Sequence, residues 1–269
     1  MTEAERQGAL DAIGAEVATC TRCRLHETRT KAVPGEGSAA TEVVFVGEGP
    51  GVNEDRSGRP FVGQAGTLLT ELLGSVGWAR EEVFITNVVK CRPPGNRDPE
   101  ADEIAACAPF LSRQLAALDP ALVVTLGRFS MARFNPGARI GQVHGTFQPA
   151  DPASGAPDAL TFAMYHPAAA LHQGSLKATL FRDMEGVPAA LLQARERRMT
   201  ESTLQSPDPV PAEVQTEPAG VAGGFEAPTS LIEVPAEYVS PAAIGESAVA
   251  AQSIELTPQT DPTDQLTLF

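Results

Sequence analysis

Short apolar runs rich in β-branched residues alternate along this chain with longer segments whose apolar side chains recur at helical spacing. Four of these runs have the length of buried strands, namely residues 42–47, 83–89, 121–127 and 160–165. The segments with helical periodicity are residues 4–17, 68–76, 102–118 and 177–195. Strands separated by helices predict an α/β protein, a three-layer α/β/α domain around a central, mainly parallel, four-stranded sheet.

The residues of chemical interest cluster at the ends of the predicted strands. In open parallel sheets, ligands bind at the carboxyl edge of the strands. At that edge lie the glycine-rich turn Gly47–Gly51, the segment Asn87–Cys91, the dipeptide Gly127–Arg128, and His166. The sequence therefore predicts a ligand-binding cleft along this edge.

The composition divides the chain into two parts. Its 269 residues carry 20 basic and 34 acidic side chains, and the net charge of −14, taken as a whole, argues against a nucleic-acid partner. Residues 200–269, however, hold 11 acidic residues, nine prolines and no Lys or Arg, which leaves 20 basic and 23 acidic residues before them, a net charge of −3. We expect residues 1–198 to form the domain and residues 199–269 to be a disordered, acidic, proline-rich tail.

Two features that the sequence lacks indicate the cellular compartment of the protein. No apolar run reaches the roughly 18–20 residues that span a bilayer. The start of the chain is acidic and polar, unlike a secretory signal. We therefore expect a cytoplasmic protein that does not interact with membranes.

Four cysteines, Cys20, Cys23, Cys91 and Cys107, favour a metal site over a disulfide framework in that compartment. Cys20 and Cys23 form a CxxC pair, and the complete set supplies four thiolates with no surplus thiol. Zinc and an iron–sulfur cluster share this ligand set, and the spacing alone does not separate them. With either group we expect a structural role, in which the site connects the N-terminal segment to the sheet.

Polar residues at the strand ends are the candidates for chemistry. The turn that contains Gly47 and Gly49 can bring its backbone close to a ligand, but it lacks the GxxxxGK[ST] and GxGxxG patterns of nucleotide-binding loops. Glu48 places a carboxylate at the cleft. Asn87 lies inside an apolar strand and is therefore either bonded to the backbone or kept for a ligand. His166 follows the fourth strand.

Together these motifs resemble those of the type-4 uracil-DNA glycosylases, the iron–sulfur branch of the uracil-DNA glycosylase superfamily. The resemblance covers roughly residues 15–195. It consists of the four-cysteine spacing, GEGPG at 47–51, GRPFVG at 58–63, NVVKCRPPGNRDP at 87–99 and HPAA at 166–169. One such motif is weak, but five in the same order are specific.

The resemblance implies excision of uracil from DNA by hydrolysis of the N-glycosidic bond, and a structural [4Fe-4S] cluster on the four cysteines. It also implies that Phe61 stacks on the flipped uracil and that Asn87 reads its pyrimidine edge. His166 is expected to donate a hydrogen bond to uracil O2, where negative charge develops. Glu48 is expected against the base and the reacting centre.

One departure from the family pattern concerns the activation of water. Related glycosylases with a GQDPY loop have an aspartate where this chain has Gly49. Water activation therefore falls to Glu48, with Glu54 and Asp55 as alternatives.

Other departures concern contacts with DNA. Ala170 occupies the position where the superfamily often has a leucine that fills the vacated base stack, and Leu171 is the candidate replacement. His172 stands where many type-4 members have an arginine, which predicts weaker and more pH-sensitive phosphate binding. Because the domain is nearly neutral, DNA binding must rest on a local basic rim. The candidates for that rim are Arg92, Arg97, Lys90, Arg128 and Arg133.

The last five residues, 265–269, look like the short motif that bacterial replication and repair proteins insert into the sliding clamp. The expected contacts are Gln265, Leu266, Leu268 and Phe269. We expect a monomer that acts on uracil-containing DNA in the nucleoid.

Three functions remain open on the sequence alone. The first is a monofunctional uracil-DNA glycosylase. The second is a related glycosylase that prefers another damaged base. The third is an iron–sulfur or zinc protein that binds nucleic acid or transfers electrons without being an enzyme.

Overall fold

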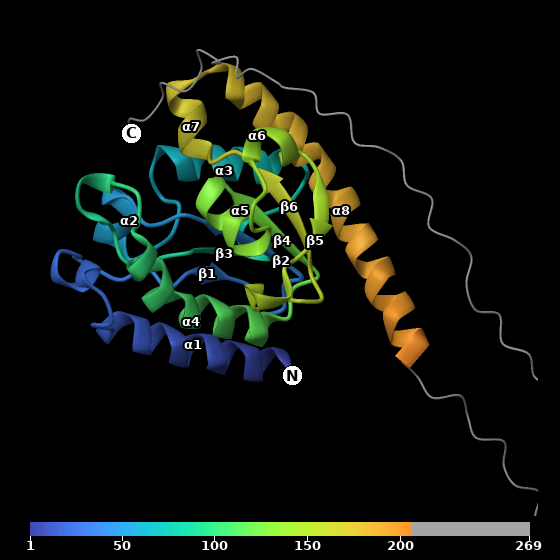
Figure 1. Ribbon diagram of the computed structural model, residues 1–269, viewed down its shortest axis with the longest axis horizontal. Helices are drawn as coiled ribbons and strands as arrows, with labels where there is room; N and C mark the ends of the chain where they lie inside the picture. The colour runs from blue at the N-terminus through green and yellow to red at the C-terminus, as the bar shows by residue number, and fades with distance from the viewer. Residues whose placement is uncertain (206–269) are drawn as a thin grey trace, which may run out of the picture. The chain divides into compact units, whose positions relative to one another are not determined.

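The computed structural model describes residues 1–205 and contains the expected three-layer α/β/α domain (Figure 1). Four parallel strands form the centre of its sheet in the order β3-β2-β4-β6. They are β2 (Val43–Gly47), β3 (Phe84–Asn87), β4 (Leu122–Leu126) and β6 (Leu160–Met164). All are fully buried, which explains why they read as continuous apolar runs rather than as an alternating pattern.

The sheet has six strands rather than the four expected. At one edge β1 (Glu36–Gly37) pairs antiparallel with β3, and at the other β5 (Phe147–Pro149) pairs antiparallel with β6. These edge strands are two and three residues long, and neither is buried. Strands that short cannot produce a recognisable hydrophobic period, so the sequence pattern does not reveal them.

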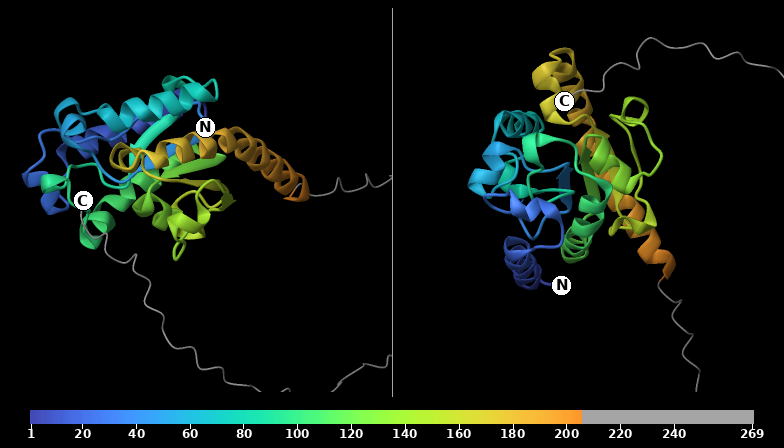
Figure 2. Two further views of the ribbon diagram at one scale, coloured as in Figure 1. Left: turned by 90° about the horizontal axis from the view of Figure 1, so that it is seen from above. Right: turned by 60° about the vertical axis from the view of Figure 1, so that its left-hand side comes forward.

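Four long helices cover the two faces of the sheet (Figures 1 and 2). They are α1 (Glu3–Thr19), α3 (Gln64–Ser75), α4 (Ala101–Leu118) and α8 (Ser175–Gln205). Successive side chains of β2 point to opposite faces: Val44 and Val46 pack with α1 and α4, whereas Phe45 packs with α3 and α8. The strands are thus buried from both sides, as the three-layer prediction requires.

Short helices in the connections between strands shape the carboxyl edge of the sheet. Helices α2, α5 and α7 follow β2, β4 and β6, so their first residues stand close to the strand ends. Their bounds, with that of α6, are α2 (Val52–Ser57), α5 (Arg128–Phe134), α6 (Ile140–Val143) and α7 (Pro167–His172). Single 3-10 turns occur at η1 (Arg24–Glu27), η2 (Arg80–Glu82), η3 (Pro94–Asn96) and η4 (Pro152–Ser154).

Helix α8 is longer than its periodic pattern indicates, since it continues to residue 205 and includes the first residues that we assigned to the tail. Arg198 holds this end of the helix through hydrogen bonds from Nη2 to Asp119 Oδ1 (2.9 Å) and to Pro120 O (2.7 Å). The rest of the expected tail, with the motif at 265–269, lies outside the described residues. Within residues 1–205, no helix is both long and apolar enough to cross a bilayer.

Candidate active site and metal centre

Gly47 and Asn87 occupy paired positions at the carboxyl ends of β2 and β3. They lie so close together that a Cβ atom on Gly47 would stand 2.4 Å from Asn87 Oδ1 and 2.6 Å from Phe61 Cζ. Real Cβ atoms do not make contacts that short, so only glycine fits at position 47. The strand ends therefore bring three of the residues singled out in the sequence to one point.

Phe61 reaches this point through an uncommon backbone conformation. Its φ of 50° lies in the left-handed region that residues with side chains rarely adopt. Gly66, in the first turn of α3, permits the arrangement, because a Cβ there would lie 1.8 Å from Phe61 O. The Phe61 ring is buried and stacks on the His166 ring at a centroid distance of 5.6 Å and an angle of 29°. An aromatic face and an imidazole thus border the same site.

The side chain of Asn87 is buried, and its Oδ1 accepts no hydrogen bond. A buried polar atom without a partner costs roughly 1–3 kcal/mol, so such atoms are uncommon and call for an explanation. The sequence left two roles open for this side chain, bonding to the backbone or to a ligand. The unpartnered oxygen favours the ligand.

His166 is the N-cap residue of α7, and its Nδ1 accepts a hydrogen bond from the amide of Ala168 at 3.1 Å. The proton of the neutral ring is therefore on Nε2. Burial lowers the pKa of His166 to about 4, although Glu54 acts in the opposite direction. The sequence left the charge of this imidazole undecided. In the folded protein at neutral pH it is a neutral donor through Nε2–H.

Glu48 follows β2 directly and is partly buried. Burial raises the pKa of the Glu48 carboxyl to about 7, the charge of Asp98 raises it further, and Arg128 opposes both effects. Asp98 and Arg128 form an ion pair with each other. A carboxyl group that titrates near neutral pH beside a cleft is typical of acid–base residues.

Glu54 and Asp55 are the alternatives for water activation. Both carboxylates accept hydrogen bonds from main-chain amides of neighbouring loops. Glu54 Oε1 accepts hydrogen bonds from the amides of Val62 and Gly63 at 2.8 and 2.9 Å, directly after Phe61. Asp55 is buried and accepts one from a main-chain amide at 2.8 Å. The Glu48 carboxylate, by contrast, accepts no hydrogen bond from any described residue. Of the three carboxylates, Glu48 is thus the one free to act on a ligand.

Gly49 leaves no space for the aspartate of the related loops. A Cβ atom at this position would lie 2.8 Å from Val89 Cγ2, and Val89 is itself buried. A larger side chain at 49 would require the segment after β3 to move.

The four cysteines line one pocket. They form no disulfide. Three of the sulfurs accept hydrogen bonds: Cys20 Sγ from the main-chain amide of Arg22 at 3.5 Å, Cys91 Sγ from Arg29 Nη1 at 3.2 Å, and Cys107 Sγ from the main-chain amide of Lys90 at 3.3 Å. No three His, Cys, Asp or Glu side chains of the described residues are grouped so as to hold one metal ion. The fold thus brings the four thiols to one pocket.

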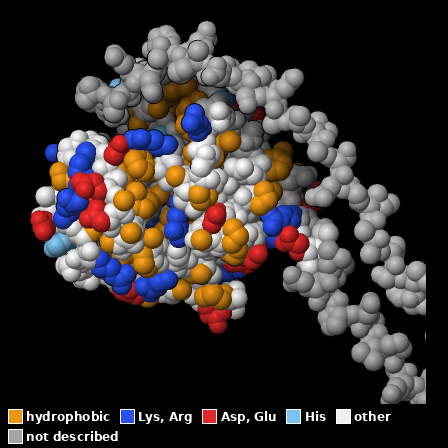
Figure 3. Space-filling model, in the orientation of Figure 1, with side chains coloured by type: hydrophobic (Ala, Val, Ile, Leu, Met, Phe, Trp, Pro, Cys, Tyr) orange, Lys and Arg blue, Asp and Glu red, His pale blue; other side chains and the backbone are white. Residues whose placement is uncertain are grey.

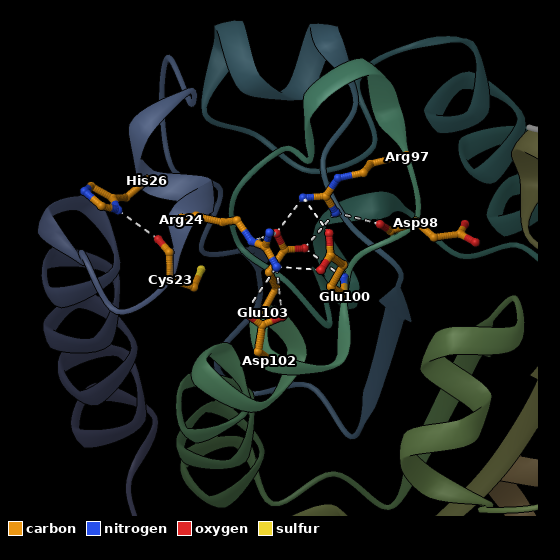
Figure 4. A network of polar contacts seen from close by, with 8 residues as sticks. All are labelled: Cys23, Arg24, His26, Arg97, Asp98, Glu100, Asp102 and Glu103. Carbon is orange, nitrogen blue, oxygen red and sulfur yellow. Dashed lines mark hydrogen bonds and ion pairs between the residues drawn. The ribbon is translucent and has the colours of Figure 1, made fainter.

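Ion pairs with a buried carboxylate attach the cysteine loop to α4 (Figure 4). Arg24, next to Cys23, places its Nε 3.2 Å from Glu103 Oε1, and Arg97 Nη2 approaches the same oxygen to 2.6 Å. Glu103 is fully buried, and the hydrogen bonds from Arg97 are the main reason that its pKa is lowered. The carboxylate thus joins the first cysteine pair to the segment that follows β3.

Lys90 is not on the DNA-facing surface where we expected it. Its side chain is 1% exposed, and burial lowers its pKa to about 8. The remaining candidates for the basic rim each have a polar partner: Arg92 with Asn96, Arg97 with Glu103, Arg128 with Asp98, and Arg133 with Ser112. On the face shown in Figure 3, Lys and Arg occur in several small groups among acidic and apolar side chains.

The exposed apolar residue of α7 is Leu171. Its side chain is 46% exposed, whereas Ala170 is 7% exposed and packs in the core. Leu171 also borders a hollow between α7 and α3, together with Gln64 and Lys177. A residue that enters the base stack must project from the surface, and of the two only Leu171 does so.

Comparison with known proteins shows the family to which this chain belongs. The sequence profile of the uracil DNA glycosylase superfamily matches residues 34–185. A type-4 uracil-DNA glycosylase from Saccharolobus solfataricus is 47% identical over 188 residues, which cover 68% of this chain and 86% of that protein. A protein of the same name from Archaeoglobus fulgidus is 55% identical over 122 residues, which cover 45% of this chain and 61% of that protein. One from Thermotoga maritima is 50% identical over 135 residues, which cover 50% of this chain and 70% of that protein. This chain belongs to the uracil-DNA glycosylase superfamily, in its type-4 branch.

Proposed function

We propose that this protein is a monofunctional uracil-DNA glycosylase, which extrudes uracil from DNA and hydrolyses its N-glycosidic bond to leave an abasic site. The reaction initiates base excision repair. The observation that carries this proposal is the buried, unpartnered Oδ1 of Asn87 beside Phe61, whose ring in turn stacks on His166. The target bond is hidden within a duplex, so the base must leave the stack, at a cost of a few kcal/mol, before these residues can contact it.

The carboxamide of Asn87 supplies the selectivity. Uracil carries a proton on N3 that Oδ1 can accept, and an O4 that the amide nitrogen can donate to. Neutral cytosine has no proton on N3, so it would leave Oδ1 unpartnered and bring its own acceptor against it. A site whose buried polar group is satisfied by only one of two similar ligands discriminates strongly between them.

His166 and Glu48 stabilise the two charges of the transition state. Cleavage of the C–N bond leaves negative charge on uracil and positive charge on the sugar. The Nε2–H of His166 is fixed in direction by the bond from Ala168 to Nδ1, and it donates to uracil O2 as a preorganised oxyanion donor. Glu48, when ionised, stabilises the sugar cation and orients the attacking water.

We further propose that Cys20, Cys23, Cys91 and Cys107 hold a [4Fe-4S] cluster. Support comes from the shared pocket and from the donors to Cys91 and Cys107. The cluster supplies no chemistry to uracil excision; bound, it ties the N-terminal segment to the residues after β3. Cys91→Ala is expected to lower the iron content and the stability of the protein, and a full complement of iron in that variant would refute the ligand set.

The proposal extends to the end of the chain, where Gln265, Leu266, Leu268 and Phe269 would fill an apolar groove of a sliding clamp. A monomer tethered in this way would search nucleoid DNA near the replication machinery. Deletion of residues 265–269 is expected to abolish binding to the clamp while excision from a short oligonucleotide is unchanged. Clamp binding that survives the deletion would refute the motif.

The functional proposal is tested by a panel of labelled oligonucleotides that contain uracil, hypoxanthine or ethenocytosine, in single and double strands. Alkali breaks the strand wherever a base has been removed. Cleavage of the uracil substrates is the expected result. Cleavage of another lesion alone would assign a different base to the pocket, and no cleavage in any substrate would leave a protein that binds nucleic acid without being a glycosylase.

A further inference from the structure

Lys90 carries a buried positive charge without a carboxylate partner. It lies between Asn87 and Cys91, and its side chain is 1% exposed. Its ammonium donates three hydrogen bonds, all to neutral oxygens: Thr86 Oγ1 at 2.6 Å, Asn87 O at 2.8 Å and Gln114 Oε1 at 2.7 Å. None of the salt bridges found within residues 1–201 includes it.

Such a charge is costly unless an opposite charge is near. Hydrogen bonds to neutral oxygens satisfy the three N–H groups but leave the charge itself uncompensated in a medium of low dielectric constant. The fold would therefore tolerate Lys90 poorly if nothing anionic stood beside it.

The cysteine pocket is where that opposite charge belongs. Lys90 lines this pocket, and its main-chain amide donates to Cys107 Sγ. Two further cations, Arg22 and Arg29, line it as well, whereas no Asp or Glu is among the lining residues. A pocket with cationic walls and four thiols suits an anionic group, and an iron–sulfur cluster with four thiolate ligands is a net anion.

The Lys90 side chain also contacts Asn87, the residue proposed to read the base. The ammonium holds the main-chain carbonyl of Asn87, whose side chain presents the unpartnered Oδ1. Gln114 braces the lysine in turn, since its Nε2 donates to Pro34 O at 2.7 Å. Lys90 is therefore in contact with both the cysteine pocket and the uracil pocket.

We propose that Lys90 is a positioning residue that couples these two pockets: its buried ammonium is the counter-charge of the cluster and at the same time fixes the backbone of Asn87. The inference rests on the proposed function, because it requires both the cluster and base reading by Asn87. It predicts that loss of the charge alters the cluster electronically and the uracil pocket geometrically.

The test compares Lys90→Met with Arg22→Met in the full-length, cluster-loaded protein. Both substitutions remove one cation that lines the pocket, but Arg22 is exposed and its charge is screened by water. The midpoint potential is measured by redox titration followed by electron paramagnetic resonance, and KM and kcat are measured on a uracil oligonucleotide. Lys90→Met is expected to make the potential more negative than Arg22→Met does, because a nearby cation stabilises the reduced, more anionic cluster. It is also expected to raise KM several-fold.

Gln114→Glu provides a second variant of almost unchanged shape, in case Lys90→Met does not fold. The new carboxylate would neutralise the ammonium, so the potential is again expected to become more negative. The inference is overturned if the folded variants keep the wild-type potential, or if Lys90→Met shifts it no more than Arg22→Met does. Failure of the proposed function would be seen separately, as wild-type protein without iron or without excision of uracil.

Discussion

Gly47 and Asn87 stand side by side at the ends of two neighbouring parallel strands, and the Asn87 oxygen fills the space that a side chain at position 47 would need. The contact makes the base-reading oxygen sensitive to a single methyl group. In Gly47→Ala, the new Cβ would press on Asn87 Oδ1 and on the Phe61 ring, at 2.4 and 2.6 Å. We expect excision of uracil to fall by at least about tenfold, which corresponds to roughly 1.4 kcal/mol of transition-state stabilisation.

Gly74→Ala is the matched control for that substitution. It is the same chemical change near the end of α3, and a Cβ there meets nothing within 4 Å. Excision by Gly74→Ala is expected to equal that of the wild type. Equal activity of Gly47→Ala and Gly74→Ala in a single-turnover assay would show that position 47 does not border the reading site.

The Nε2–H of His166 is expected to carry much of the rate. His166→Ala removes this donor and also the cap of α7, and loss of one oxyanion donor typically costs about 10²–10³ in rate. His166→Gln keeps an amide donor and should recover part of the loss. Single-turnover rates on a uracil oligonucleotide provide the comparison, with visible absorbance to verify the metal content. A rate for His166→Ala close to the wild type would remove the imidazole from the reaction.

Activity should depend on pH through Glu48. Because burial raises the pKa of its carboxyl to about 7, the group is protonated and inactive in acid and becomes the required carboxylate as the pH rises through 7. His166 adds nothing to this profile above about pH 5, because its pKa is lowered to about 4. We expect kcat/KM to increase with pH to a plateau above pH 7, and Glu48→Gln to be slow with no such increase. The same rise in the variant would assign the ionisation to another group.

Glu54 is expected to act through the backbone of the Phe61 loop. Glu54→Gln keeps the shape of the side chain but weakens the acceptor for the amides of Val62 and Gly63. Hydrogen bonds to charged groups contribute about 1.5–3 kcal/mol, so the thermal midpoint Tm should fall by several degrees. Because the loop positions Phe61, KM should rise more than kcat falls. An unchanged Tm together with a large loss of kcat would instead make Glu54 a direct participant in the reaction.

The sequence predicts well the positions of those residues that lie at the ends of the central strands. The buried parallel strands are continuous apolar runs, and topology alone then brings Glu48, Asn87 and His166 to one edge of the sheet. The role of Lys90 could not be predicted in this way. We expected it among the cations of the DNA-facing rim, whereas its partners Thr86 and Gln114 come from a strand and a helix that only the folded protein brings together.

Other features could not be predicted from the sequence because they depend on close contacts within the folded protein. The left-handed backbone of Phe61 is compatible with the fold because Gly66 has no side chain to collide with Phe61 O. The roles of Glu54 and Asp55 were also undecided, because a carboxylate in a loop looks the same in sequence whether it binds backbone amides or a substrate. The hydrogen bonds of the folded loop distinguish these cases.

The central claim is that a uracil-specific pocket is built around Asn87. The most direct test measures single-turnover excision from one uracil oligonucleotide by the wild type and by Asn87→Ala, in samples matched for iron content. The wild type is expected to release uracil, and the variant is expected to lose most of this activity while it keeps its fold and metal. Release of uracil by both proteins at similar rates would contradict the account.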